Sequence, residues 1–536
     1  MTEHDYIIVG AGSAGCVLAA RLTENGRHSV LLLEAGGSDA SPWIRVPIGY
    51  GRTFNHPKYN WMYDTEPEPA FGNRTTFWPR GKLLGGSSSI NAMVYVRGQP
   101  GDFDDWAAAG NLGWSYRDVL PYFRKSEHHA WGTSEWHGAD GPLEISDIRA
   151  DAHPLCQTFI DSCAAVGIHP TADFNGAQFA GAGTWHMTIG NGLRSSTATA
   201  FLHPSTGRPN LEVRTRAHVT RVLFSGTEAT GVEYLRGGAR HTARARREVI
   251  LAGGAVNSPQ LLQLSGVGDP ALLQGLGIPV VRAAPAVGMG LQDHIAVSYV
   301  YRARVPTLND ELYPLFGKVK AALRYAVGRR GPLGMSVNQA GAFVRGRSGL
   351  ARPNFHLYFN PLSYTMTQGP TRKMMNPDAF PGFIMSFNSC RPTSRGRIMI
   401  RSPDPMKAPA IHTNYLSTVE DIADVYDGAR VLRRISAAHP LADVIESELL
   451  PGPAVLSDAE VLADFRARAG TVYHACGTCG MGPDPSRSVV DATLRVHGLA
   501  RLRVVDASIF PTVTSGNTNA PTIMVAEKGA ELILAD

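Results

Sequence analysis

The residues most suggestive of chemistry come first in the chain, where glycines at G-x-G-x-x-G spacing occupy residues 10–15. A β-branched run over residues 6–9 precedes them and predicts a buried strand, and good helix formers follow from Cys16. Such glycines permit a tight turn and the close approach of a pyrophosphate, whose charge the N-terminus of the helix stabilises. Glu34 lies about 20 residues farther on, at the end of a second expected strand, where its carboxylate can accept a hydrogen bond from a ribose hydroxyl. The pattern predicts a dinucleotide site without distinguishing NAD from FAD.

A second glycine-rich stretch could contact phosphate groups. Gly85 and Gly86 would let the backbone approach a large flat ligand, and residues 87–89 are serines whose hydroxyl and N–H groups could meet phosphate oxygens. Asn91 adds an amide. Because the apolar run 92–96 follows directly, we expect this turn to be packed rather than to act as a flexible linker.

Polar residues gather again near the other end of the chain. His474 precedes a glycine-rich turn, Asp506 ends an expected strand, and a polar loop over residues 514–519 leads into a helix with Pro521 just inside it. Taken singly, a histidine is more often a core or surface residue, and an asparagine in such a loop is more often a cap than a catalyst.

Composition limits the class of protein. At 536 residues the chain should form two or more domains, and 43% hydrophobic with 18% charged residues is ordinary for a globular enzyme. The net charge of +5 includes no long basic run, which argues against nucleic acid and suits an anionic cofactor or loose attachment to anionic lipid. Polar residues 1–5 predict no signal peptide, and no apolar stretch approaches the roughly 20 residues needed to cross a bilayer.

The six cysteines are scattered, which favours a reducing cytoplasm over a disulfide scaffold. Cys476 and Cys479, close to His474, invite a zinc or redox interpretation. Zinc normally takes four nitrogen or sulfur ligands, and no second cluster supplies the remainder. We therefore interpret Cys476 and Cys479 as two small residues in a turn, and no metal is expected.

The middle of the chain predicts further elements of the dinucleotide-binding part. Strands are expected within residues 210–252, followed by a helix with Ser258 as its N-cap, Pro259 at its first position and Gly266 at its end. Helices are also expected over residues 102–125 and near 153–166.

Residues 300–465 have a different pattern of apolar and polar residues, which predicts a second domain built on an antiparallel sheet with helices behind it. Its strands are expected at residues 353–359 and 382–387, with 395–401 able to pair with them. A helix is expected where apolar residues fall on one face, namely Ile422, Val425, Ala429, Leu432 and Ile435. Residues 305–344 could include a lid over a pocket.

Together, these stretches resemble the glucose-methanol-choline (GMC) oxidoreductase family, and within it the choline-dehydrogenase-like alcohol dehydrogenases and oxidases. The similarity covers nearly the whole chain in order, in the glycine motif with Glu34, residues 80–91, 253–268 and 287–294, the His474 turn, and residues 506–528. The resemblance implies an α/β fold with a Rossmann-like FAD-binding domain and a discontinuous substrate-binding domain. The FAD-binding domain would comprise residues 1–152, 210–299 and 466–536, and the substrate-binding domain residues 153–209 and 300–465.

The resemblance also implies that the dinucleotide is FAD rather than NAD, because the family binds FAD. The positions that match its cofactor contacts are Gly10, Gly12, Ser13, Ala14, Gly15, Glu34, Ala35, Trp61, Gly86, Ser87, Asn91, Ala92, Met93, Val94, Val219, Asp506, Ala507, Asn519, Pro521 and Thr522. Some relatives tether the flavin through a histidine just before the residue that matches Asn91. Ile90 stands there in this sequence, so non-covalent FAD is expected.

The family's catalytic pair carries over as His474 and Asn519. The resemblance implies oxidation of a primary alcohol to an aldehyde by hydride transfer to flavin N5, with His474 accepting the hydroxyl proton and Asn519 orienting the alcohol. Reoxidation by O2 or by a quinone-like acceptor stays open, with a preference for a dehydrogenase. The substrate pocket is expected to be lined by Tyr358, Phe359, Phe387, Cys390 and Tyr473.

Three other functions remain as alternatives. Choline could be the substrate, although its quaternary ammonium needs an aromatic cage or a carboxylate, and a neutral primary alcohol is favoured. A lyase of the same fold is the second, either a hydroxynitrile lyase or a fatty-acid photodecarboxylase, for which Cys390 would be suggestive. A non-enzymatic FAD-binding protein is the third, disfavoured because His474 and Asn519 are both present. At most peripheral attachment to the inner membrane is expected, and the oligomeric state is left open.

Overall fold

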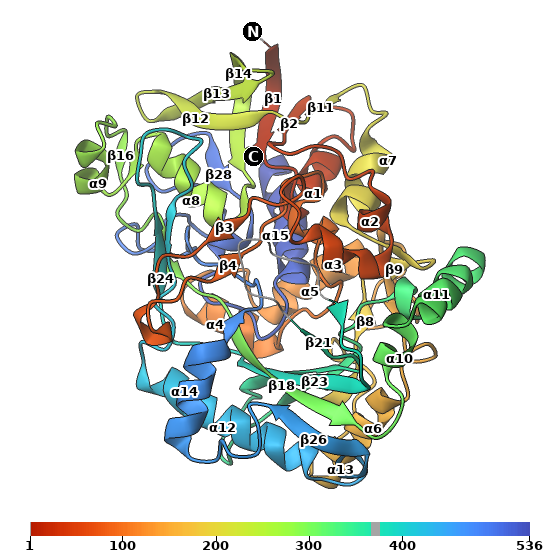
Figure 1. Cartoon of the computed structure of the whole chain (residues 1–536). Helices are drawn as coiled ribbons and strands as arrows, with labels where there is room; N and C mark the ends of the chain where they lie inside the picture. The colour runs from red at the N-terminus through yellow and green to blue at the C-terminus, as the bar shows by residue number, and fades with distance from the viewer. Residues whose placement is uncertain (1, 366–375) are drawn as a thin grey trace.

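The computed structural model describes residues 2–365 and 376–536 of the chain. Two large sheets organise these residues, one in the upper half and one in the lower half of Figure 1, with helices packed around both. The first and last segments of the sequence, red and blue in the figure, lie side by side in the upper half.

The upper sheet is mostly parallel, as the glycine motif predicts. Its parallel strands lie in the order β11 (Leu211–Arg214), β2 (Val30–Leu33), β1 (Thr2–Val9), β14 (Ala239–Leu251) and β28 (Leu502–Val504). The long strand β14 continues into an antiparallel extension with β13 (Glu228–Arg236) and β12 (His218–Ser225). All four residues of β2 are buried, which is typical of a parallel sheet covered on both faces. The predicted α/β class and the strands within residues 210–252 are confirmed.

The two ends of the chain meet on this sheet. The glycine turn joins β1 to α1 (Ser13–Leu22), which packs against the last helix, α15 (Asn519–Leu534). Arg21 on α1 forms a 2.8 Å ion pair with the buried Glu527 on α15. The first and last motifs of the sequence therefore contribute to one site. The other predicted helices are also present, as α4 (Pro100–Ala108), α5 (Tyr116–Ser126) and α6 (Leu155–Ala165).

The lower sheet is antiparallel, as expected for the second domain. Its strands lie in the order β26 (Ile445–Leu450), β18 (Ile295–Ala303), β23 (Gly382–Ser389), β20 (Phe355–Asn360), β19 (Ala340–Val344) and β7 (Gly181–Thr184). The amphipathic helix expected from residue 422 is present as α12 (Val419–Ser436), with Val425, Ala429, Leu432 and Ile435 buried. The expected pairing of residues 395–401 with this sheet is wrong. Strand β24 (Gly396–Met399) instead lies between β17 (Met289–Leu291) and β25 (Ala410–His412).

The helix after β14 begins earlier than Ser258. α8 spans Gly254–Leu264 and contains Pro259 in its interior. A proline there lacks the N–H that would bond to the carbonyl of Ala255, four residues before it. The Thr478 hydroxyl donates to that carbonyl at 2.7 Å, which satisfies the acceptor that the proline leaves free. The Ser258 hydroxyl is used elsewhere, in a 2.6 Å hydrogen bond to Asp506.

The segment 305–344, expected to include a lid, forms two helices and a buried strand instead. Its end is strand β19, which lies inside the lower sheet and is buried throughout. Its first part forms α10 (Leu308–Leu312), which lies against the body, and α11 (Leu315–Gly328), which projects from the side of the molecule in Figure 1. A single hinged lid is therefore not the structure of this segment. The domain limits stay predictions, and strand β18 of the lower sheet begins at Ile295, before the expected limit at residue 300.

Candidate active site

One cavity of about 1070 Å³ is lined by residues from both sheets. Its wall includes the glycine turn, the start of α8, one face of the lower sheet, and the segments around residues 474 and 517. Cavities of this size hold large cofactors or ligands.

The glycine turn leaves no room for side chains at one end of this cavity. Gly10 has φ +100°, and a Cβ there would lie 2.6 Å from the carbonyl oxygen of Ala252. Gly86 has φ +51°, and its Cβ would lie 2.7 Å from the Cα of Gly12. Gly12 caps the N-terminus of α1 without a side-chain hydrogen bond, so the first N–H groups of that helix are available to a ligand. This geometry fits a pyrophosphate.

Glu34 stands beside the same turn, at the end of β2. Its two carboxylate oxygens accept hydrogen bonds from the N–H groups of Ala11 and Gly36, each at 2.8 Å. Burial raises the pKa of Glu34 to about 7, while the two donors hold its carboxylate in one orientation. Each oxygen keeps a second lone pair, so the group fits the predicted role of ribose acceptor.

The structure brings most of the predicted cofactor contacts to the cavity wall. Those that line it are Gly10, Gly12, Ser13, Ala14, Glu34, Ala35, Trp61, Gly86, Ser87, Asn91, Ala92, Met93, Val94, Val219, Asp506, Ala507, Asn519 and Thr522. Gly15 and Pro521 lie behind the wall. A Cβ on Gly15 would be 1.8 Å from the carbonyl oxygen of Gly10, and Pro521 is buried in the first turn of α15.

A buried arginine that the sequence did not single out supports residues 91–94. Arg194 donates to the side-chain oxygen of Asn91 at 2.7 Å and to two backbone carbonyls, those of Ser88 and Ile44. Burial lowers the pKa of Arg194 to about 9, and its hydrogen-bond partners among the described residues are carbonyl and amide oxygens. This side chain therefore holds Asn91 against the serine-rich turn.

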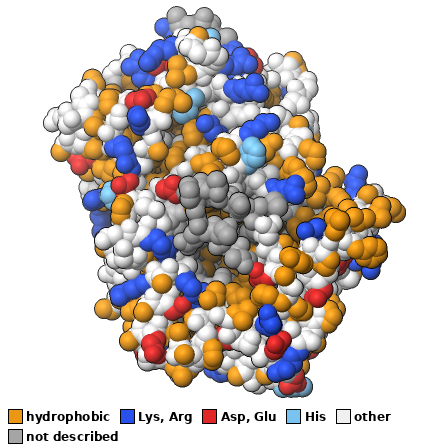
Figure 2. Space-filling view, in the orientation of Figure 1, with side chains coloured by type: hydrophobic (Ala, Val, Ile, Leu, Met, Phe, Trp, Pro, Cys, Tyr) orange, Lys and Arg blue, Asp and Glu red, His pale blue; other side chains and the backbone are white. Residues whose placement is uncertain are grey.

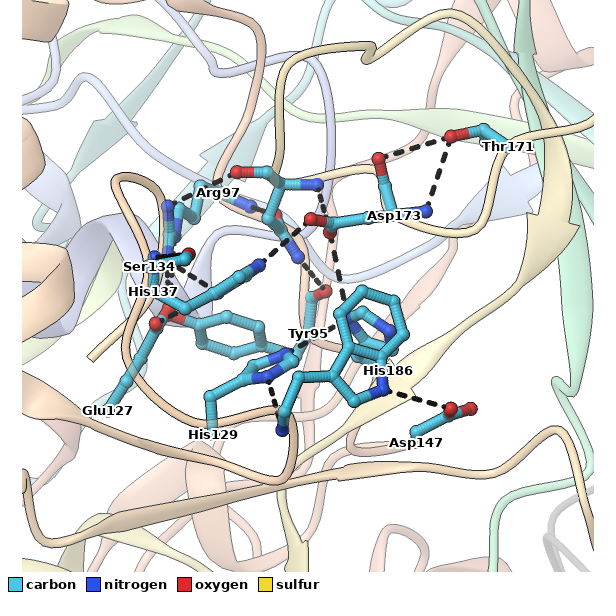
Figure 3. A network of polar contacts seen from close by, with 12 residues as sticks. Tyr95, Arg97, Glu127, His129, Ser134, His137, Asp147, Thr171, Asp173 and His186 are labelled. Carbon is cyan, nitrogen blue, oxygen red and sulfur yellow. Dashed lines mark hydrogen bonds and ion pairs between the residues drawn. The ribbon is translucent and has the colours of Figure 1, made fainter. Parts of the chain in front are cut away.

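A second network, shown in Figure 3, lies directly after the segment 91–94 and anchors its continuation. Tyr95 and Arg97 both donate to the buried carboxylate of Glu127. His137 lies between two carboxylates, with Nδ1 at 3.1 Å from Glu127 and Nε2 at 2.9 Å from Asp173. Burial lowers the pKa of His137, but its hydrogen bonds to the two carboxylates outweigh burial and raise it overall. The network stabilises the backbone behind this part of the cavity wall.

His474 also lines the cavity and is almost fully buried. Its Nε2 is 3.1 Å from the side-chain nitrogen of Asn517, and its Nδ1 is 2.9 Å from Nδ1 of His294. Nε2 of His294 is in turn 3.0 Å from the carbonyl oxygen of Cys390. The backbone N–H of His474 donates to Asp293 at 2.7 Å, which holds the turn in place.

These contacts determine which nitrogen of His474 can accept a proton. The Cys390 carbonyl only accepts, so His294 carries its proton on Nε2 and presents a bare Nδ1. Nδ1 of His474 must then be the donor, and its Nε2 is left as the acceptor beside Asn517. Burial lowers the pKa of His294 to about 4, and burial with the nearby His294, His356 and Arg80 lowers that of His474 well below its ordinary value. Both rings are neutral at neutral pH.

Asn519 is not the asparagine beside His474. It is the first residue of α15, and its side-chain oxygen accepts a 2.8 Å hydrogen bond from Ser13 in the glycine turn. Asn517, two residues earlier in the loop, faces His474 instead. The predicted pairing of His474 with Asn519 is therefore corrected to Asn517, while Asn519 keeps its predicted place on the cofactor side of the cavity wall.

One face of the lower sheet forms the wall opposite the glycine turn. Tyr358, Ser386 and Ser298 lie in one cross-strand row, with the two serine hydroxyls 2.9 Å apart. Asn360, Ile384 and Val300 form the next row and also line the cavity.

Three predicted pocket residues do not face this cavity. Phe359 and Phe387 alternate with Tyr358 and Ser386 along their strands, so their rings point to the other face of the sheet, into the hydrophobic core. Cys390 is buried in a separate apolar cluster, and burial raises the pKa of its thiol well above the ordinary value. Only its backbone carbonyl takes part in the site. Tyr358 and Tyr473 line the cavity as predicted.

The strands of the lower sheet contribute no charged side chain to the cavity among the described residues. Their lining residues are Ala296, Ser298, Val300, Tyr358, Asn360, Ile384, Ser386, Leu449 and Leu450. This wall of the cavity therefore offers hydroxyl, amide and apolar groups, and charged lining residues such as Asp64, Asp378 and Arg468 come from other segments. Cys476 and Cys479 are buried as free thiols, and no group of three or more described metal-ligating side chains is placed to hold an ion.

Comparison with known proteins agrees with this geometry. Family models described as GMC oxidoreductase match residues 4–296 and 392–526. The chain belongs to the GMC oxidoreductase family.

Among its relatives, a mitochondrial choline dehydrogenase of Mus musculus is 46% identical over 99% of this chain and 89% of its own length. An alcohol dehydrogenase [acceptor] of Pseudomonas putida is 44% identical, over 99% and 96%. The crystal structure of a pyridoxine 4-oxidase from Mesorbium loti superposes with a TM-score of 0.89 at 32% identity, over 98% of both chains. These similarities confirm the predicted FAD-dependent oxidoreductase class and GMC fold.

Proposed function

We propose that this GMC oxidoreductase oxidises a neutral primary alcohol to the aldehyde, with His474 as the base and Asn517 as the residue that orients the alcohol. The observation that carries the proposal is the single acceptor nitrogen of His474, held beside the Asn517 amide at 3.1 Å in the cavity wall. An alcohol needs one group to take its hydroxyl proton and one donor to stabilise the oxygen as negative charge develops. These two side chains supply one of each.

The chain's own residues perform the proton chemistry in this proposal. His294 keeps Nδ1 of His474 protonated, so Nε2 receives the hydroxyl proton once the alcohol hydroxyl has taken the place of the Asn517 N–H at its one lone pair. The amide of Asn517 has two N–H groups, and one of them can donate to the alcohol oxygen as the proton leaves. When bound, FAD supplies the acceptor for the hydride from the adjacent carbon.

We propose that the FAD is held without a covalent bond. Ile90 occupies the position before Asn91 and packs into an apolar cluster with Ile44 and Leu83, so it offers no nucleophile to the flavin. The glycine turn, Glu34 and the serine-rich turn hold the cofactor instead. Protein denatured in acid should release all of its yellow colour into the supernatant, and colour retained on the chain would contradict this.

A neutral alcohol fits the cavity better than choline. A quaternary ammonium is usually compensated by a carboxylate or an aromatic cage. The strands of the lower sheet offer Tyr358 but no carboxylate, and their remaining polar groups are the hydroxyls of Ser298 and Ser386 and the amide of Asn360. The carboxylates Asp64 and Asp378 line the cavity outside these strands. The hydroxyl and amide groups of the strands suit hydroxyl or ether oxygens, although several relatives carry the name choline dehydrogenase.

We favour a dehydrogenase that passes electrons to a quinone-like acceptor rather than to oxygen. The Pseudomonas putida relative, named alcohol dehydrogenase [acceptor], supports this, while other relatives are named oxygen-dependent choline dehydrogenase. Turnover under air alone should be at least about tenfold slower than turnover under nitrogen with a soluble quinone. Equal rates would identify an oxidase.

The substrate class is tested by mixing holoprotein anaerobically with a panel of alcohols and following the flavin absorbance. Neutral primary alcohols should bleach the flavin and yield one aldehyde per flavin, and choline should bleach it at least about tenfold more slowly at equal concentration. Faster bleaching by choline would identify choline, rather than a neutral alcohol, as the preferred substrate. No bleaching by any alcohol, with FAD bound, would refute alcohol oxidation itself.

A further inference from the structure

Helix α11 is held to the molecule by a narrow stripe of residues. Of its side chains only Ala321 is buried, with Gly317 and Tyr325 partly covered one turn to either side. The Tyr325 hydroxyl donates to the carbonyl of Gly192 at 2.8 Å, which attaches the helix near its end. The rest of the helix projects from the side of the body in Figure 1.

The outward face of α11 is apolar. Phe316, Val319, Leu323 and Val327 recur at helical spacing on one side, and they are 81%, 49%, 62% and 90% exposed. Together they form the outward stripe, which lies within the orange patch at the right of Figure 2. A soluble protein rarely exposes so continuous an apolar surface unless it is an interaction site. Most other strongly exposed apolar side chains stand on separate elements.

The charge on α11 itself is entirely positive, and one of its arginines, Arg324, lies 3.5 Å from Asp151 of another segment. Residues 312–330 contain no aspartate or glutamate and five basic residues, Lys318, Lys320, Arg324, Arg329 and Arg330. An apolar stripe flanked by lysine and arginine is the pattern of a helix that lies in the interface of an anionic bilayer. An acidic membrane surface complements both features at once.

The same segment leads directly to the cavity. It leaves the lower sheet after β18 and returns through Ser336, whose hydroxyl is 3.4 Å from that of Tyr50. Tyr50 and the adjoining Val337 and Asn338 line the cavity. None of the described helices has the length and apolar character of a membrane span.

We propose that α11 is a membrane-docking helix, whose outward stripe inserts at the boundary between headgroups and acyl chains of an anionic bilayer while its basic residues contact the headgroups. Docking brings the part of the cavity wall formed by Val337 and Asn338 close to the bilayer surface. The proposal does not depend on which alcohol the enzyme oxidises.

Cosedimentation of the holoprotein with vesicles tests the apolar contribution. Vesicles of equimolar phosphatidylglycerol and phosphatidylcholine should bind the wild-type protein, and the double variant L323S/V327S should lower the partition coefficient at least about tenfold. The matched control V419S/L456S removes the same two residue types, 76% and 72% exposed, from other elements. It should stay within about twofold of wild type.

The basic contribution has its own test. The variant K318Q/K320Q should weaken binding to the anionic vesicles at least about threefold, and binding of wild type should fall as salt is added. Vesicles of phosphatidylcholine alone should bind markedly less.

Bound FAD absorbance and melting temperature verify that each variant is folded. Absence of wild-type binding to the anionic vesicles would overturn the proposal, as would equal losses in the outward-stripe variant and the V419S/L456S control. A concentration-dependent dimer that L323S/V327S abolishes, with no vesicle binding, would assign the outward stripe to a second copy of the chain instead.

Discussion

Replacing Asn517 and Asn519 one at a time by alanine separates the two roles that the structure gives them. Asn517 faces Nε2 of His474 at 3.1 Å, whereas Asn519 accepts from Ser13 at 2.8 Å. Both side chains line the cavity and they are only two residues apart, so each variant is a matched control for the other.

The two substitutions should affect different quantities, because Asn517 contacts the catalytic histidine and Asn519 contacts the glycine turn that holds FAD. A donor aimed at a developing oxyanion contributes about 100- to 1000-fold in rate, or about 2.7–4 kcal/mol. Asn517→Ala should therefore slow flavin reduction by about two to three orders of magnitude and leave FAD bound. The bond between Ser13 and Asn519 is neutral and contributes about 0.5–1.5 kcal/mol, so Asn519→Ala should weaken FAD binding by about two- to tenfold and change the reduction rate far less.

The assay is anaerobic stopped-flow mixing of each holoprotein with saturating alcohol, observed at the flavin band, with FAD content measured beforehand. Reduction that is slow in Asn519→Ala and near wild type in Asn517→Ala would refute the pairing of His474 with Asn517. Equal slowing in both variants would show that the loop acts as a unit, and the separate roles would then be wrong.

Three further predictions concern the surroundings of the site. His294→Leu removes the acceptor for Nδ1 of His474 and should slow flavin reduction about a hundredfold with FAD retained, measured by stopped flow. Glu127→Gln leaves the buried Arg97 without its counter-charge and should lower the free energy of unfolding by about 3–5 kcal/mol in urea titrations at pH 7. Burial opposes it, but the Arg97 and His137 contacts lower the pKa of Glu127 to about 2, so this difference should narrow as the pH falls from about 4.5 towards 2. It should also narrow as the pH rises above about 6.5, because Glu127 contributes to the raised pKa of His137. Gly10→Ala should abolish FAD retention on gel filtration, because its Cβ would overlap backbone.

Each of these has an outcome that contradicts it. A reduction rate in His294→Leu equal to wild type would show that the tautomer of His474 is set by another contact. A stability difference for Glu127→Gln that is small at pH 7, or that grows as the pH falls below about 4.5, would contradict the ion pair. For Gly10→Ala the control is Gly26→Ala, which also has positive φ but meets no atom within 4 Å. Equal FAD loss in both would attribute the effect to backbone strain alone.

The dinucleotide part of the fold follows from local sequence signals. Strand β1, the glycine turn, α1 and Glu34 are contiguous in sequence, and each residue's type matches its local geometry. The start of α8 was missed because Pro259 favours the first turn of a helix, and only the distant Thr478 satisfies the carbonyl that an interior proline leaves free.

The substrate wall was predictable in part from alternation along a strand. Tyr358 and Phe359 are consecutive residues of β20, so they cannot both face one cavity. The sequence does not reveal which of them does, since that depends on how the sheet packs against the upper one. The choice of Asn517 over Asn519 has a similar cause, because it depends on where the loop ends and α15 begins.

The polar networks behind the site could not be predicted at all. His137, Asp173 and Glu127 come from separate loops and strands, and only the packed fold brings their charges together. His294 was visible in a motif that matched the family, but its contact with His474 crosses 180 residues of sequence. No local pattern carries that information.

The central claim is that His474 takes the proton of the alcohol, and the reduction rate of His474→Ala tests it most directly. With FAD bound and the best alcohol of the panel at saturation, flavin reduction under nitrogen should be at least about a hundredfold slower than in wild type. Reduction within a few-fold of the wild-type rate, in a variant that retains its flavin, would contradict the account.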